Sequence, residues 1–272
     1  MRGLSTRTFL VHGLLAGLLA GLAAFVVAYA VGEPHVDRAI ALETGAADEA
    51  AGAPAPDGHD HTHEHAAADG HSHGEDAAVS RTTQSTWGLA TGTLAIGVVL
   101  GGLTGLLSAA GLGRLGSLRP AASTALVALL GAVSFSLVPF LKYPATPPAV
   151  GSGETVDSRT ALYFGFVAVS LVAVVAAVAA ARRAMHRWGA VPAVVAGLAT
   201  YVAAVTVAAL AFPKVDELGT FPAGVLWDFR VASLLTLLAT WVVIGAALTV
   251  LVDRTWRRQA AVEAQRAFAA SL

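Results

Sequence analysis

The feature that most constrains this fold is the recurrence of long apolar runs along the chain. Each run has about 20–24 residues, enough for a helix to cross a hydrocarbon core of about 30 Å. Because lipid offers no hydrogen-bond partners, each run is expected to form a helix that satisfies its own backbone. The sequence therefore predicts an all-α integral membrane protein with six transmembrane helices, at Phe9–Val31, Trp87–Ala110, Ala121–Leu141, Ala161–Ala181, Val191–Phe212 and Val231–Val252.

The composition agrees with a chain that lies mostly in lipid. Only 13% of the residues are charged, whereas a soluble domain carries about 25%. The apolar runs predict membrane lipid as a contacting partner. The net charge of −1 argues against a polyanionic partner such as nucleic acid. The chain has no cysteine, so any metal must be bound by imidazole, carboxylate, carbonyl or water. We find no H-E-x-x-H, G-x-S-x-G or P-loop motif, and we expect no enzymatic activity.

The basic residues indicate the orientation of the helices. With both termini in the cytoplasm, eleven of the 17 Lys and Arg residues lie inside, against two of the 18 acidic residues. An excess of basic residues marks cytoplasmic loops, so we predict an N-in, C-in protein of the inner membrane. The predicted parts are residues 1–31 (N-terminus and first helix), 32–86 (external loop), 87–252 (helices two to six) and 253–272 (cytoplasmic tail). The basic tail, which contains Trp256, is expected to form a short helix at the membrane surface.

The first apolar run also has features of a signal peptide. Basic residues precede it, and Ala28-Tyr29-Ala30 follows it like a cleavage site. The run is longer than a usual signal-peptide core, and Gly13-xxx-Gly17-xxx-Gly21 is a helix-packing pattern. We expect a retained helix, with cleavage as the alternative. The second run repeats this spacing at Gly97, Gly101 and Gly105, which favours tight packing over pore lining.

The long external loop is rich in histidine and acidic residues. Six of the nine histidines lie within fifteen residues, in a segment too poor in large apolar side chains to fold alone, so disorder is expected. Neutral imidazole binds Co²⁺, Ni²⁺ and Zn²⁺, with affinity falling below pH about 6.5. The segment is interpreted as a weakly selective metal collector, or alternatively as a solvated linker. The predicted ligands are His59, His61, His63, His65, His71 and His73.

Proline and charged residues recur where the predicted helices reach the outside. The third run continues into the proline-rich segment Val138–Gly151, which indicates broken backbone of the kind that membranes tolerate beside water or inside protein. We predict a shared external vestibule in which Lys142 and Arg230 pair with acidic residues; simple helix termination is the alternative. The predicted metal ligands of the vestibule are Glu33, His35, Asp216, Glu217 and Asp228.

Six short runs together resemble a known family. They are His12–Gly17, Gly32–Pro34, Ala39–Glu43, Val138–Gly151, Arg159–Tyr163 and Phe221–Arg230. As a set they resemble the CbtA family of predicted cobalt transporter subunits, and the resemblance covers the whole membrane domain. It implies pairing with CbtB, a small single-helix protein with its own histidines; a homo-oligomer is the other assembly considered.

These observations lead to one functional prediction and one alternative. The protein is predicted to carry a divalent transition metal inward across the membrane, with Co²⁺ as the substrate and Ni²⁺ or Zn²⁺ as the other candidates. No charged residue lies in the middle of any apolar run, so a dehydrated ion would need carbonyl or hydroxyl ligands. The alternative is a non-transporting accessory or metal-delivery subunit of an uptake system.

Overall fold

The computed structural model describes residues 4–52, 79–151, 153–216 and 218–271, and their regular structure is helical. It contains six helices that are long and apolar enough to cross a membrane. The predicted class, an all-α membrane protein with six spans, is therefore confirmed. Measured over the described residues, the spans are Thr6–Gly45, Arg81–Gly111, Pro120–Lys142, Val156–Trp188, Ala190–Ala211 and Ala223–Ala269.

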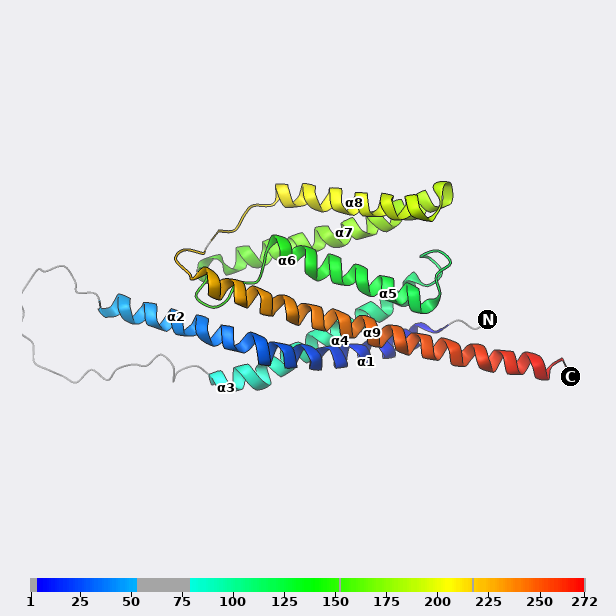
Figure 1. The fold of residues 1–272 in the computed structure, drawn as a ribbon, viewed down its shortest axis with the longest axis horizontal. Helices are drawn as coiled ribbons and strands as arrows, with labels where there is room; N and C mark the ends of the chain where they lie inside the picture. The colour runs from blue at the N-terminus through cyan, green and yellow to red at the C-terminus, as the bar shows by residue number, and fades with distance from the viewer. Residues whose placement is uncertain (1–3, 53–78, 152, 217, 272) are drawn as a thin grey trace, which may run out of the picture.

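Several spans are built from more than one helical segment. The first joins α1 (Thr6–Val27), a π-helical turn η1 (Ala28–Gly32) and α2 (Glu33–Gly52). The second joins α3 (Arg81–Thr83), η2 (Gln84–Gly88) and α4 (Leu89–Gly111), and the third joins α5 (Pro120–Gly131), η3 (Ala132–Leu137) and α6 (Val138–Lys142). A short 3₁₀ turn, η4 (Gly153–Thr155), precedes α7 (Val156–Trp188), α8 (Ala190–Ala211) and α9 (Ala223–Ala269). The two chain ends lie at the same end of the bundle (Figure 1).

Two of the π-helical turns come just before a proline. Pro34 follows η1 and Pro139 follows η3, each by two residues. A proline inside a helix cannot donate to the carbonyl one turn earlier. The wider π turn re-bonds the neighbouring groups: the Glu33 N–H donates to the Ala28 carbonyl, and the Val138 N–H donates to the Val133 carbonyl. Pro34 therefore does not end the first helix, contrary to prediction.

The helices consequently extend past the boundaries expected from the sequence. The predicted loop 32–86 is helical at both margins, over residues 33–52 and 81–86, because α2 is rich in alanine, a strong helix former. The basic tail likewise continues α9 without a break to Ala269, instead of forming a separate surface helix. Neither glycine nor proline interrupts the chain between Gly245 and Ala269, so nothing in the sequence ends the helix earlier.

The most extensive helix contact, between α1 and α4, is made through glycine. Gly13, Gly17 and Gly21 of α1 face the glycines of α4 so closely that a Cβ atom added at Gly97 would lie 2.5 Å from the Gly17 carbonyl oxygen. Helix α9 covers this pair, and its Leu248 and Val252 pack against Phe9 and Ala16 of α1. The tight packing predicted from the glycine spacing is therefore confirmed. The residues of the contact, called the glycine contact below, are Gly13, Gly17, Gly21, Gly97, Gly101 and Gly105.

Helices α7 and α8 form a hairpin to one side of α1, α4, α5 and α9 (Figure 1). The chain turns between them at Gly189, whose φ of 85° favours glycine. The Ser170 and Tyr201 hydroxyls, 2.8 Å apart, join the two helices. The hairpin meets the other helices mainly where α7 contacts η3 and α6. That contact lies towards the end of the molecule opposite the termini.

Candidate functional site

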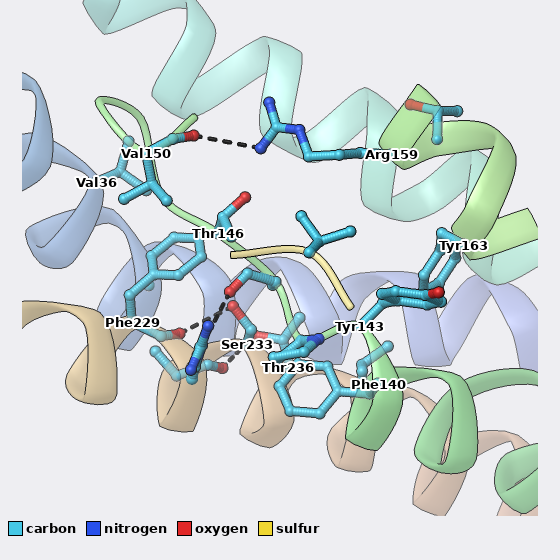
Figure 2. A pocket seen from close by; sticks show the side chains of 18 of the residues that line it. Val36, Phe140, Tyr143, Thr146, Val150, Arg159, Tyr163, Phe229, Ser233 and Thr236 are labelled. Atoms are coloured by element: carbon cyan, nitrogen blue, oxygen red, sulfur yellow. Dashed lines mark hydrogen bonds between the residues drawn. The ribbon is translucent and has the colours of Figure 1, made fainter. Parts of the chain in front are cut away.

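A cavity of about 680 Å³ opens at the end of the molecule opposite the two chain termini. We call it the distal pocket. Its walls come from η1, α2, α4, α6, α7 and α9, together with the segments that follow α6 and α8 (Figure 2). The proline-rich segment Val138–Gly151, where the sequence predicts an external vestibule, forms one wall of this cavity. The residues that this segment contributes are Phe140, Lys142, Tyr143, Pro144, Ala145, Thr146 and Val150.

The irregular backbone of this wall follows from its sequence. Helix α6 ends at Lys142, and the Tyr143 N–H still bonds the Pro139 carbonyl at 2.8 Å. Beyond it, Pro144, Pro147 and Pro148 remove the donors that another helical turn would need. The chain then turns through Ala149, at a φ of 67° that is rare for a residue with a side chain. The result is an extended wall whose backbone carbonyl and N–H groups are not bonded within a helix and therefore need other hydrogen-bond partners.

Lys142 supplies partners at the end of a neighbouring helix. Its Nζ donates to the Ala209 carbonyl at 2.8 Å and to the Phe212 carbonyl at 3.1 Å, at the C-terminus of α8. The adjacent Tyr143 hydroxyl donates to the Pro213 carbonyl at 2.8 Å, and burial raises the pKa of this phenol. A cation at a helix C-terminus satisfies orphan carbonyls and opposes the helix dipole. Lys142 therefore joins α6 to α8. The sequence predicts an acidic partner for it, but none of the described acidic residues pairs with it.

The two arginines of the pocket also bind main-chain carbonyls. Arg230 of α9 donates through Nε to the Ala145 carbonyl at 3.4 Å. Arg159 of α7 donates to the Val150 carbonyl at 3.3 Å (Figure 2). Arg230 forms no ion pair with an acidic residue in the described part of the chain; Glu217, one of its predicted partners, lies outside the described residues. Both arginines hold the proline-rich wall against neighbouring helices.

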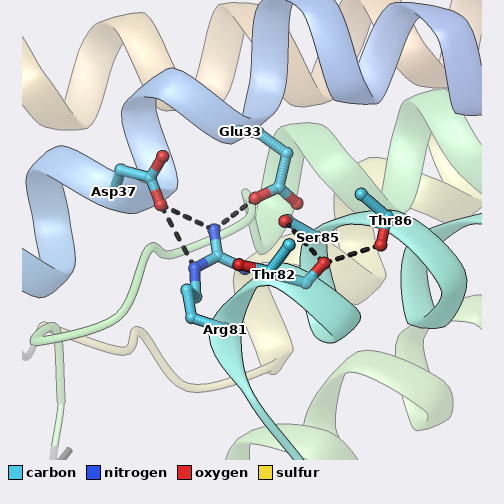
Figure 3. Close-up of polar contacts among 6 residues, drawn as sticks. All are labelled: Glu33, Asp37, Arg81, Thr82, Ser85 and Thr86. Carbon is cyan, nitrogen blue, oxygen red and sulfur yellow. Dashed lines mark hydrogen bonds and ion pairs between the residues drawn. The ribbon is translucent and has the colours of Figure 1, made fainter.

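Glu33 lines the pocket and is bound by an arginine that sequence analysis did not single out. Arg81 Nη2 pairs with Glu33 Oε2 and with Asp37 Oδ1, the latter at 2.9 Å, and Arg81 Nε donates to the same Asp37 oxygen at 3.1 Å (Figure 3). The available signal was the spacing of Glu33 and Asp37, which places two carboxylates on one helix face. The contact ties the start of α2 to α3. We call these three residues the arginine clamp.

The other predicted ligands are not gathered at the pocket. His35 lies on α2, and its Nδ1 is buried without a hydrogen-bond partner in the described structure. Asp216 and Asp228 are exposed and do not line the cavity. Within the described ranges, no group of three or more His, Asp or Glu residues could hold a metal ion. The remaining predicted ligands lie outside the described residues: His59, His61, His63, His65, His71, His73 and Glu217.

Comparison with known proteins identifies one related family. A family model described as "Probable cobalt transporter subunit (CbtA)" matches residues 6–253. The match begins in α1 and ends within α9, so it includes the glycine contact and the distal pocket. No curated protein and no solved structure matches the chain. The resemblance noted in the sequence is thereby confirmed over nearly all of the helical structure.

Proposed function

We propose a function from one premise, which is that the chain belongs to the CbtA family of probable cobalt transporter subunits. The chain is a multi-pass membrane protein with a role related to cobalt transport. More specifically, we propose that it carries Co²⁺ inward across the cell membrane, and that the distal pocket is the entrance. The family match over residues 6–253 is the observation that carries this proposal.

The proposed orientation places the distal pocket on the external side of the inner membrane. Both chain ends lie at the opposite end of the bundle (Figure 1). Eleven of the 17 basic residues fall on the side of the termini, as expected for the cytoplasmic face. In this orientation the histidine segment His59–His73 lies outside, on the same side as the pocket. It would collect metal near the entrance, without itself setting the selectivity.

Uptake by the isolated protein provides the direct test. Proteoliposomes that contain the chain alone should accumulate ⁵⁷Co²⁺ above empty vesicles, and unlabelled Co²⁺ should compete better than Ni²⁺ or Zn²⁺. The test variant replaces all six histidines of the segment with glutamine, which keeps the length and polarity of the segment. This variant should lose uptake at limiting Co²⁺ and keep it at saturating Co²⁺. Equal uptake by both proteins at limiting Co²⁺ would show that the segment is not a collector.

An accessory role is the second candidate, and two observations favour it. The family description names a subunit, and the apolar runs hold no mid-membrane charge of the kind that ion-coupled carriers use. In that case the chain alone would show no ⁵⁷Co²⁺ accumulation. Uptake would appear only when a single-helix, histidine-bearing partner is reconstituted with it. In both versions the chain is proposed to bind and pass metal without catalysing a reaction.

A further inference from the structure

The described lining of the distal pocket carries more positive than negative charge. Lys142 and Arg230 line it, and neither forms an ion pair with a described acidic residue. Among the described acidic residues only Glu33 lines the cavity, and Arg81 already binds its carboxylate. Among the described residues, a bare divalent cation would therefore meet three cationic side chains, those of Lys142, Arg159 and Arg230, and a neutralised carboxylate. An anion, in contrast, would supply a counter-charge that no described acidic residue gives to Lys142 or Arg230.

The size of the pocket also exceeds what a hydrated metal ion requires. A divalent ion with six waters occupies roughly 200 Å³, at about 30 Å³ for each water. The cavity measures about 680 Å³, which lies in the range of roughly 300–1,000 Å³ usual for small-molecule sites. The volume therefore suits an organic molecule with several non-hydrogen atoms better than a single ion.

The lining has the composition of a site for an organic ligand. Aromatic rings of Phe140, Tyr163 and Phe229 lie at the cavity (Figure 2), and Phe164 also lines it. Apolar residues outnumber those with polar side chains in the described lining. Small-molecule sites combine such apolar walls with a few polar groups that fix the orientation of the ligand. A site for a bare transition metal would instead need several oxygen or nitrogen ligands converging on one point. Among the described residues of the wall, no group of three or more His, Asp or Glu residues could hold a metal ion.

Lys142 and Arg230 keep donors for such a ligand. An ammonium group has three N–H donors and a guanidinium group has five. Lys142 uses two on the carbonyls of α8, and Arg230 makes one bond, at 3.4 Å, to Ala145. The planar guanidinium can bind a carboxylate through two parallel hydrogen bonds.

We propose that the distal pocket binds a small organic carboxylate through Arg230 and Lys142. Resting on the proposed function, we add that cobalt enters the pocket as the chelate of such a carboxylate, not as the bare ion. The carboxylate groups that do not contact the protein would hold the metal. The apolar walls would accommodate the carbon skeleton. The ligand class is thus a di- or tricarboxylate of low molecular mass, with or without bound metal.

Citrate is the probe for the test, with the full chain in nanodiscs of zwitterionic lipid. Calorimetry without metal should detect citrate binding to the unaltered protein. Arg230→Gln should weaken it about tenfold or more, as expected for the loss of a charge-assisted hydrogen bond. Arg230→Lys keeps the charge but loses the planar pair of donors, so it should weaken binding less than Arg230→Gln does. Lys214→Gln removes an exposed cation that does not line the pocket, and it should leave binding unchanged.

Three outcomes would overturn the proposal. They are no citrate binding, equal binding by the unaltered protein and Arg230→Gln, and loss of citrate binding when anionic lipid is added, which would assign the pocket to a lipid headgroup. Uptake of ⁵⁷Co then separates this inference from the proposed function. Uptake of Co²⁺ without citrate, in a protein that does not bind citrate, would sink only the inference. Citrate binding without any cobalt uptake would sink only the transport function.

Discussion

The glycine contact and the distal pocket differ in how they are stabilised within a membrane. In the glycine contact, glycines on α1 and α4 leave no side chains between the two helices, so their backbones are in direct contact. In the distal pocket, the chain leaves the helical form, and side chains reach across to bond the exposed carbonyls. Lipid provides no hydrophobic force between helices and no hydrogen bonds for backbone. Close packing holds the helices together without a hydrophobic force, and long cationic side chains supply the hydrogen bonds that lipid cannot.

This difference predicts where substitutions are tolerated. A position in the glycine contact has no room for any side chain, because its neighbours are backbone atoms that cannot move aside singly. A position in the pocket wall borders open space, and its value lies in the bond that its side chain makes. The first region should therefore respond to the size of a substitution, and the second to its chemistry.

The largest effect is expected for Gly101→Leu in the glycine contact. A Cβ at this position would lie 2.5 Å from the Gly17 Cα, so the two helices must separate. We expect a loss of about 3 kcal/mol or more in the free energy of unfolding, measured by reversible unfolding in mixed micelles. Gly92→Leu is the matched control, because Gly92 lies on the same helix with nothing within 4 Å. A similar loss in both variants would contradict the role of close backbone packing.

A smaller effect is expected for Lys142→Met in the pocket wall. Methionine keeps the length and apolar stem of the side chain and removes both bonds to the end of α8. Carbonyls left without a cationic donor should cost about 2 kcal/mol in unfolding free energy. Lys142→Arg, which keeps the charge and the donors, should recover more than half of this loss. No recovery would mean that shape, rather than hydrogen bonding, is what matters at this position.

A still smaller effect is expected for Trp241→Phe. This residue lies between the two regions, where α9 meets η3. The Trp241 Nε1 donates to the buried Ser136 Oγ at 2.7 Å, and the ring also packs beside Gly131. Loss of this bond should reduce the unfolding free energy by about 1 kcal/mol. Ser136→Ala should cost a similar amount, and the double variant should cost less than the sum of the two. Strict additivity would show that the bond contributes nothing to stability.

The smallest effect is expected for Arg81→Gln in the arginine clamp. The Arg81 side chain is 36% exposed and that of Asp37 is 64% exposed, so solvent screens the pair. We expect a change of at most about 1 kcal/mol in global stability. Amide exchange near residues 81–86 should nevertheless increase, because the contact holds the start of α3 against α2. Unchanged exchange would show that the clamp does not order this end of the bundle.

The sequence predicted the location of the candidate site better than it predicted the contacts within it. The proline-rich segment Val138–Gly151 correctly indicated where a cavity would form, since prolines exclude a continuous helix. The partners of its charged residues could not be read from the sequence. Lys142 was expected to meet a carboxylate and instead bonds the carbonyls of Ala209 and Phe212. A lysine can bond either the free carbonyls of a helix end or an acidic residue, and the sequence does not show which of these partners lies nearby.

The sequence by itself determined the class of the protein and the number of spans. Each apolar run must become a helix in lipid regardless of its neighbours, because the cost of unpaired backbone is local. The glycine spacing likewise marked the faces available for packing. Only the tertiary structure decided which glycine helices meet, that Arg81 binds Glu33 and Asp37, and that the pocket lining is cationic. Those outcomes depend on which distant segments become neighbours, and no local pattern of residues encodes that choice.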